Sequence, residues 1–238
     1  MNKSHRPGGA SPRGRGDHVP PTAPSAGPPS TTGRSAGRLL YVNHSLGMGG
    51  IETMIRDYAL SLKAEGWRVE VAIFQGGGQL AEQLVAAGCP VHDLGKRDGL
   101  DPGLALRLRR LIRRRRFEVV HSHNYSAWLY SALACTGLPG VRLVQTEHSR
   151  VATLARRHLL LRWLARRTSA VVGVSADVAR SLVDDVGADA QRVCFVPNGV
   201  SLTRFRPDAL RRSDLRRRLG LPESALVYGI LARLQPVK

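Results

Sequence analysis

The sequence has few cysteines and no long apolar run, and each absence excludes classes of protein. The three cysteines are scattered and form no CxxC pair. That spacing argues against a disulfide framework or a zinc ribbon and favours a reducing compartment. No apolar run approaches the ~18 residues that span a bilayer, and the N-terminus lacks the apolar segment of a signal peptide. These features predict a cytoplasmic protein rather than a secreted or transmembrane one.

Acidic residues are scarce relative to basic ones. Asp and Glu number 18 against 36 Lys and Arg, which gives a formal net charge of +18. Much of this charge falls on two predicted helices, 102–116 and 154–166, whose arginines flank apolar stripes. A basic amphipathic helix can lie on an anionic membrane surface, although it can equally be a solvated face. With no known nucleic-acid-binding motif and no aromatic stacking platform, a nucleic-acid partner is not predicted.

The first 37 residues lack Ile, Leu, Phe, Tyr and Trp. They contain seven Gly and seven Pro instead. Such a segment cannot bury enough apolar surface to offset the loss of chain entropy on folding. We therefore predict a disordered Gly/Pro-rich tail over 1–37.

From Arg38 onward, short apolar runs alternate with segments of helical periodicity. Strands that are apolar on both faces and separated by helices are typical of a parallel sheet covered by helices. The pattern predicts an α/β doubly wound, Rossmann-like domain over 38–205. The predicted strands are Leu39–Val42, Val69–Phe74, Pro90–Leu94, Phe117–His121, Val141–Thr146, Ala170–Val174 and Val193–Val196. The predicted helices are Ile51–Ala64, Gln79–Ala87, Pro102–Arg116, Ser126–Cys135, Leu154–Arg166 and Ala176–Val186.

The last 33 residues, 206–238, have a different organisation. A basic helix is predicted over Leu210–Leu219, and an apolar strand over Ala225–Leu231. We interpret this segment as a linker helix followed by the first strand of a second domain that is truncated in this sequence.

Ligands of a doubly wound sheet bind beyond the carboxyl ends of its strands, and several such ends carry glycines or polar residues, among them Glu147, His148 and Ser149 after the strand predicted over 141–146. Gly49 and Gly50 open a helix, where exposed N–H groups can face a phosphate; an ordinary strand–helix turn is the alternative. His121 and His123 share one face of a strand end. We interpret His121 as a core residue and His123 as the one positioned to contact a substrate, while a metal site on the pair is a further alternative.

Five segments resemble, in order and spacing, the retaining GT-B glycosyltransferases of the glycogen synthase and bacterial mannosyltransferase type. The resemblance covers about 38–238. It implies a nucleotide-sugar donor bound between two Rossmann-like domains, with this chain forming the N-terminal half of a GT-B fold and holding most of the acceptor. The five segments are Gly49–Glu52, Glu118–His123, Val172–Ser175, Val196–Val200 and Ala232–Lys238.

By position, the resemblance assigns donor-side roles to several residues. It makes His123 the catalytic residue, placed beside the reacting sugar. Gly49 and Gly50 would line the donor diphosphate, and Arg233 and Lys238 would neutralise the diphosphate leaving group, a role that suits fixed positive charge.

The resemblance also assigns Asn124 and His148 to the acceptor pocket, with a hydroxyl acceptor, lipid-linked in some members. It implies no metal and no cofactor, since the nucleotide sugar is a substrate. Two positions depart from the family pattern, Ala232 in place of Gly and Ser201 in place of Asp. The paired glutamates of the family's second domain are not present.

Three functional hypotheses follow. The leading one is the N-terminal module of a glycosyltransferase, peripheral at the inner membrane face and inactive as this chain alone. The second is a non-catalytic protein that binds a membrane or a partner protein through its basic helices. The third is a metal-dependent hydrolase built on His121 and His123.

Overall fold

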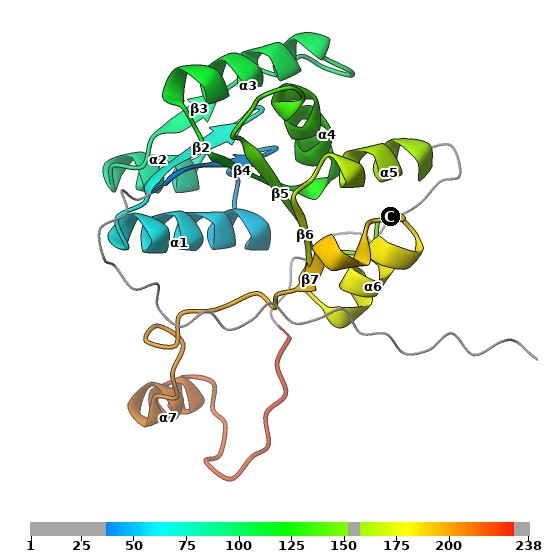
Figure 1. Cartoon of the computed structure of the whole chain (residues 1–238). Coiled ribbons are helices and arrows are strands. Elements are labelled where there is room, and N and C mark those ends of the chain that lie inside the picture. The colour runs from blue at the N-terminus through cyan, green and yellow to red at the C-terminus, as the bar shows by residue number, and fades with distance from the viewer. Residues whose placement is uncertain (1–36, 152–157, 231–238) are drawn as a thin grey trace, which may run out of the picture. The chain divides into compact units, whose positions relative to one another are not determined.

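A seven-stranded parallel sheet forms the centre of the first part of the chain (Figure 1). The computed structural model describes residues 37–151 and 158–230. The strand order is β3-β2-β1-β4-β5-β6-β7, so the predicted doubly wound, Rossmann-like α/β fold is confirmed. The strands are β1 (Arg38–Asn43), β2 (Arg68–Ile73), β3 (Val91–Asp93), β4 (Val119–His123), β5 (Arg142–Glu147), β6 (Ala170–Gly173) and β7 (Val193–Phe195).

Helices cover both faces of the sheet. Figure 1 shows α1 and α2 on one side, and α3, α4 and α5 on the other. Residues of β1 alternate between the two layers: Leu39 and Tyr41 pack with α1 and α2, whereas Leu40 and Val42 pack in the cluster that contains α3 to α6. The helices are α1 (Gly50–Ala64), α2 (Gln79–Ala86), α3 (Pro102–Arg115), α4 (Asn124–Cys135), α5 (His158–Arg166) and α6 (Ala176–Asp184).

Strand β4 is shifted from its predicted position. It runs two residues beyond the predicted end at His121, and α4 begins at Asn124 rather than Ser126. Polar residues at 121–123 end the apolar pattern on which the prediction was based. The ladder nevertheless continues, because His121 pairs with Val144 and His123 with Thr146 of β5.

A close approach of α6 to the sheet depends on Gly173, the last residue of β6. A Cβ atom at this position would lie 2.5 Å from the backbone N of Ala179. The hydroxyl of Ser175 accepts a hydrogen bond from the N–H of Val178 at 3.1 Å and so caps α6. Gly173 and Ser175 therefore give the Val172–Ser175 segment a structural role as the junction between β6 and α6.

The chain divides into two compact units between Asn198 and Gly199. The second contains α7 (Ala209–Arg218), capped by Asp208 and followed by Gly220 with φ of +65°. The strand predicted over 225–231 is wrong for 225–230, which form neither helix nor strand. A β-strand needs a neighbour for its backbone groups, and no described strand pairs with this segment.

Several predictions fall outside the described residues. They are the tail over 1–36, the first part of the helix predicted from Leu154, and the positions Arg233 and Lys238. Among the described residues, no helix is long and apolar enough to cross a membrane.

Candidate functional site

The carboxyl ends of β1 and β4 lie side by side at the point where the strand order reverses. From β1 the chain proceeds to β2 and β3 on one side, and from β4 to β5, β6 and β7 on the other. Such a switch point is where doubly wound sheets bind their ligands. Two asparagines connect the strand ends: the Asn124 amide Nδ2 donates to Asn43 Oδ1 at 2.9 Å.

Asn124 adopts a left-handed backbone conformation, with φ of +70°. Asparagine tolerates this region better than most residues, although it remains sparsely populated. The conformation turns the chain directly from β4 into α4. It places the Asn124 side chain against Asn43, which in turn donates to the carbonyl oxygen of Ser45 at 2.9 Å.

Three histidines cluster beside this junction. His121 and His123 stack with ring centroids 4.5 Å apart. His123 Nδ1 lies 3.1 Å from Nε2 of His148, and His121 Nε2 lies 2.8 Å from Thr146 Oγ1. The structure therefore brings together the predicted catalytic residue His123 and the predicted acceptor residues Asn124 and His148.

Burial keeps this cluster uncharged. Desolvation lowers the pKa of His121 to about 4, and it lowers the pKa of His123 well below its usual value, with further lowering by the neighbouring imidazoles. The pKa of His148 is also lowered by burial. At neutral pH the three rings therefore donate and accept hydrogen bonds as neutral groups, with one proton shared between His123 Nδ1 and His148 Nε2.

The Nε2 atom of His123 is buried and has no hydrogen-bond partner among the described residues. A buried polar atom without a partner is costly and uncommon, and it is often found at a functional site. Within the same residues, no three His, Cys, Asp or Glu side chains are grouped so that they could hold a metal ion. His121, unlike His123, has a hydrogen-bond partner for its Nε2 atom in the hydroxyl of Thr146. This contact agrees with a structural role for His121.

A cavity of about 230 Å³ lies at the end of β5, lined in part by Asn124 and Glu147, which are chain neighbours of His123 and His148. Its walls combine polar and apolar side chains, the composition typical of small-molecule sites. It is lined by Asn124, Tyr125, Glu147, Ser149, Arg150, Val151 and Leu161.

Glu147 is the buried carboxylic acid of this cavity. Its Oε1 accepts a hydrogen bond from Gln145 Nε2 at 2.9 Å, and Gln145 in turn accepts one from the Ser122 hydroxyl. Desolvation raises the pKa of Glu147 to about 7, although the Gln145 hydrogen bond opposes the shift. The site thus contains a carboxyl group that changes charge near neutral pH.

Arg150 supplies the positive charge at the same cavity. Its guanidinium forms ion pairs with two carboxylates: Asp177 of α6 at 3.8 Å, and Asp185, directly after α6, at 3.1 Å. These carboxylates raise the pKa of the guanidinium, and the largest cause is the hydrogen bond that Arg150 donates to Asp185. No role was predicted from the sequence for Arg150, or for Glu147, although Glu147 stands in a strand-end segment with His148. The available signal was their position, directly after a buried strand and beside His148.

Gly49 and Gly50 lie at the start of α1, as predicted. Gly50 has open space around it, since a Cβ there would meet no atom within 4 Å. At Gly49, by contrast, a Cβ would lie 2.1 Å from Oε2 of Glu52. The Glu52 carboxylate therefore covers this helix end and complements the helix dipole, and a diphosphate could reach Gly49 only if Glu52 moved.

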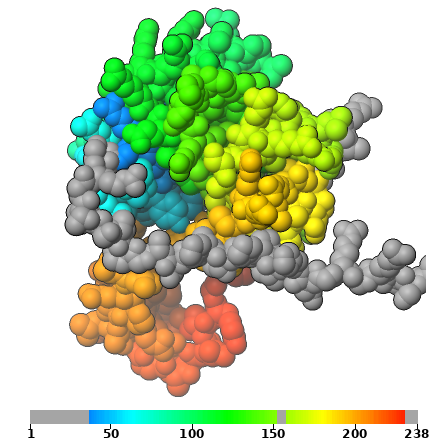
Figure 2. All heavy atoms as spheres, in the orientation of Figure 1, coloured from blue at the N-terminus to red at the C-terminus, as the bar shows by residue number. Residues whose placement is uncertain are grey.

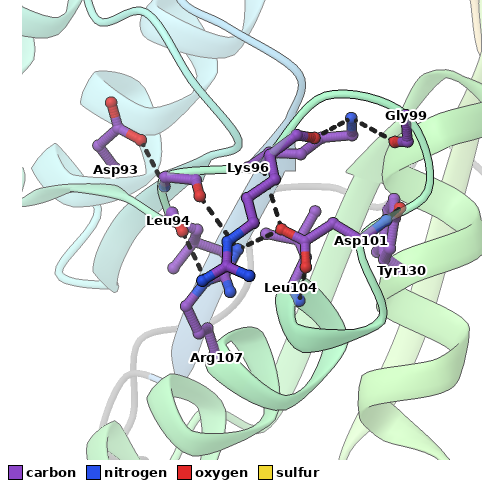
Figure 3. Close-up of polar contacts among 10 residues, drawn as sticks. Asp93, Leu94, Lys96, Gly99, Asp101, Leu104, Arg107 and Tyr130 are labelled. Atoms are coloured by element: carbon purple, nitrogen blue, oxygen red, sulfur yellow. Dashed lines mark hydrogen bonds and ion pairs between the residues drawn. The ribbon is translucent and has the colours of Figure 1, made fainter.

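The loop between β3 and α3 is held by a network of hydrogen bonds (Figure 3). Arg107 donates to the carbonyl oxygens of Leu94 and Gly95 and pairs with Asp101 at 2.6 Å. Hydrogen bonds from the Arg97 N–H and the Arg107 guanidinium lower the pKa of Asp101 to about 2. This loop emerges at the same edge of the sheet as the site and is fixed by a carboxylate that is ionised at neutral pH.

A protein-family comparison decides the family. Residues 48–204 match Glycosyltransferase Family 4. The chain belongs to this family. The match spans more than half of the chain and includes all the residues of the histidine cluster and its cavity.

Curated relatives agree with the family assignment. The chain is 36% identical over 134 residues to a D-inositol 3-phosphate glycosyltransferase of Geodermatophilus obscurus, covering 51% of this chain and 29% of the relative. It is 30% identical over 222 residues to the Nocardia farcinica protein of the same name, covering 80% of this chain and 47% of that protein. It is 26% identical to an Escherichia coli UDP-Gal:alpha-D-GlcNAc-diphosphoundecaprenol alpha-1,3-galactosyltransferase, covering 55% and 36%. The chain thus spans less than half the length of these relatives.

Solved structures show the same fold. The glycosyltransferase of Rickettsia africae aligns with a TM-score of 0.67 at 18% identity, covering 80% of this chain and 51% of that one. Anabaena Alr3699/HepE in complex with UDP aligns with a TM-score of 0.63 at 19% identity, covering 77% and 50%. The family 4 chain described here has the fold of the N-terminal half of a GT-B glycosyltransferase.

Proposed function

We propose that this chain forms the acceptor side of a glycosyltransferase that moves a sugar from a nucleotide-sugar donor to a hydroxyl acceptor. One observation carries the proposal within the family: the neutral, buried His123, with Nε2 unpartnered among the described residues, at the switch point of the sheet. A neutral imidazole can form a hydrogen bond with a sugar hydroxyl. Because it carries no positive charge, it does not attract the donor diphosphate. His123 is the residue that we assign to the reacting sugar.

The acceptor occupies the cavity next to His123 in this proposal. Asn124 is turned into position by its bond to Asn43, and His148 is linked to His123. Glu147 and Arg150 line the cavity and offer an acceptor and a donor for hydrogen bonds to a polyhydroxylated molecule. No metal or organic cofactor takes part, because the leaving diphosphate is stabilised by protein groups.

The donor is the ligand that the chain contacts least in this proposal. Gly49 and Gly50 line the diphosphate after Glu52 has moved, and Arg233 and Lys238 neutralise it. Further contacts come from the part of the relatives' length that this chain does not match. A UDP-sugar is the first candidate, since UDP and UDP-glucose are bound to HepE in its solved structures.

A lipid-linked acceptor at the inner face of the cytoplasmic membrane is the acceptor class that we favour. The E. coli relative is named for a diphosphoundecaprenol-linked substrate. The basic residues of α3 and α5 supply the charge that an anionic membrane surface attracts. The protein is then cytoplasmic and peripheral.

The test is sugar transfer from a panel of radiolabelled nucleotide sugars to a membrane-lipid extract. It is measured for the 238-residue chain, alone and fused to the C-terminal half of the Nocardia farcinica relative. We expect turnover in the fusion and none in the chain alone, because donor contacts are required from both sides of the ligand. Replacement of His123 by Ala should cut turnover in the fusion at least a hundredfold while the fold is retained.

Two results would contradict this assignment. One is a fusion that folds and binds donor but transfers no sugar to any acceptor, which would favour a non-catalytic binding protein. The other is an equal loss of turnover in folded His121→Ala and His123→Ala variants, which would remove the special role of His123.

A further inference from the structure

A cleft of about 600 Å³ opens at the edge of the sheet opposite the candidate site. It lies where β4 and β5 begin, between the C-terminal end of α3 and the loop that joins α4 to β5. The green atoms of α3 and α4 lie at the surface of the molecule in Figure 2. The cleft is lined by Arg109, Ile112, Arg113, Arg116, Phe117, Glu118, Gly137, Leu138, Pro139, Gly140 and Val141.

Positive charge is concentrated in and beside this cleft. Arg113 lines both the cleft and an adjoining cavity of about 310 Å³, whose other lining residues are Arg110 and Arg114. Among the residues that the structure describes, Glu118 is the one acidic residue that lines either cavity. Within the described part of the chain, the side chains of Arg110, Arg113, Arg114 and Arg116 make no ion pair.

Two neighbouring arginines have structural partners. Arg109 donates to the carbonyl oxygens of Ala134 and Thr136 at 2.9 and 2.6 Å, which fixes its guanidinium at the mouth of the cleft. Arg115 forms an ion pair with Glu70 at 3.6 Å and does not line the cleft. The arginines that line the cavities are therefore the ones without a carboxylate.

Arg116 gives independent support, because its backbone has φ of +56° and ψ of +47°. The position directly after a helix is usually Gly when it adopts this left-handed conformation, since a side chain there is strained. Strained residues concentrate at functional sites. The guanidinium of Arg116 is thus held at the cleft in an unfavourable backbone conformation.

We propose that this cleft binds the phosphate group of a ligand that also carries an apolar portion. Guanidinium groups bind phosphate oxygens in a bidentate manner, and three of them line the cleft. Phe117, Leu138 and Val141 supply an apolar wall beside them. Like charges three and four residues apart on a helix repel each other, and a bound phosphate would relieve the repulsion around Arg113.

The dipole of α3 does not by itself account for the arginines at the cleft. Cations in the last turn of a helix are favoured, but the effect is confined to that turn and is weakened by exposure. It does not require a cavity with an apolar wall or a strained Arg116. The site is also distinct from the donor site of the proposed function, because the two lie at opposite ends of the parallel strands.

The experiment compares the 238-residue chain with two variants of equal charge. Arg113→Gln removes the residue shared by both cavities. Arg180→Gln removes an exposed arginine of α6, which donates a hydrogen bond to the carbonyl oxygen of Ala176 in its own helix. Binding of inorganic pyrophosphate is measured by calorimetry at 0.15 M salt. Co-sedimentation is measured with vesicles of phosphatidylcholine, with and without phosphatidic acid.

The expected result is binding of at least one phosphate probe that is weakened about tenfold by Arg113→Gln, the effect of one lost charged hydrogen bond. Arg180→Gln should change it less than twofold. Binding of pyrophosphate alone identifies a soluble ligand, whereas binding of phosphatidic acid vesicles in preference to pyrophosphate identifies a lipid headgroup.

Two outcomes would overturn the proposal: no binding of either probe, or equal weakening by both variants, which is the result of general charge attraction. Arg116→Gly provides a second check, in which a loss of binding cannot be attributed to a loss of stability. It removes a guanidinium and relieves the backbone strain, so binding should fall while the melting temperature does not.

Discussion

Replacement of Glu147 by Gln should make the protein more stable at pH 8 than the wild type. Burial raises the pKa of Glu147 from 4.5 to about 7. Between these two pH values, the folded state holds a proton that the unfolded state has released, so the free energy of unfolding falls as the pH rises. Glutamine has no proton to lose, and its side-chain oxygen can still accept the hydrogen bond from Gln145.

The magnitude follows from the two pKa values. Each tenfold change in proton affinity corresponds to about 1.4 kcal/mol, so the wild type loses about 3 kcal/mol of stability between pH 4.5 and pH 8 through this group. The stabilisation is fully present below pH 4.5 and is lost as the pH rises through 7. The difference between Glu147→Gln and wild type should therefore grow from near zero at pH 4.5 to about 3 kcal/mol at pH 8.

Guanidinium chloride unfolding curves at pH 5 and pH 8 measure this difference. The buried histidines have the opposite pH dependence, because their lowered pKa values cost stability as the pH falls below 6.5. Their contribution is common to both proteins and cancels in the comparison. Glu82→Gln, at an exposed position of α2, is the matched control for the loss of one carboxylate.

The reasoning is refuted if the difference between the variant and the wild type does not change with pH. It is also refuted if Glu147→Gln is less stable at pH 8, since the ionised carboxylate would then be favoured by its surroundings. A carboxylate that lowers stability at neutral pH is typical of a site whose chemistry uses it. In the fusion used for the transfer assay, the same variant should lose activity despite its greater stability.

Three further outcomes are expected. His123→Ala should cut the turnover of the fusion at least a hundredfold, whereas His121→Ala, removing a bonded structural residue, should act mainly on the melting temperature. Gly173→Ala should lower the free energy of unfolding by about 3 kcal/mol or more in denaturant titrations, because its Cβ would overlap the backbone of α6; an unchanged value would show that α6 can shift freely. Arg107→Met should lower the melting temperature at pH 7, and the difference should shrink toward pH 2 as Asp101 is protonated; a constant difference would mean that the ion pair is not its cause.

The alternation of strands and helices was predictable because the sheet is buried on both faces, so each strand is marked by its own apolar run. Apolar periodicity does not mark a strand where burial does not require apolar residues. His121, Ser122 and His123 belong to β4 through backbone pairing with β5, which apolar periodicity does not register. At 225–230 an apolar segment has the composition of a strand, but no described strand pairs with it.

The site was predicted in part. The carboxyl ends of parallel strands meet at one edge, so the strand-end residues His123, Asn124 and His148 were expected near one another, whereas their roles were implied by the family resemblance and stay predictions. The pKa of Glu147 depends on how deeply it is buried, and the orientation of Arg150 depends on Asp185, 35 residues away. Neither is encoded in local spacing. Similarly, Gly49 has the composition of a phosphate-binding turn, but the position of the Glu52 carboxylate emerges only in three dimensions.

The outermost strands of the sheet, β3 and β7, contain three residues each. An edge strand exposes unpaired N–H and C=O groups that can recruit a strand from another molecule, and short edges limit that recruitment. Three residues offer too few groups to anchor an incoming chain firmly. The sheet itself therefore gives little basis for aggregation at high concentration, and self-association of the purified protein should depend on surfaces other than its edges.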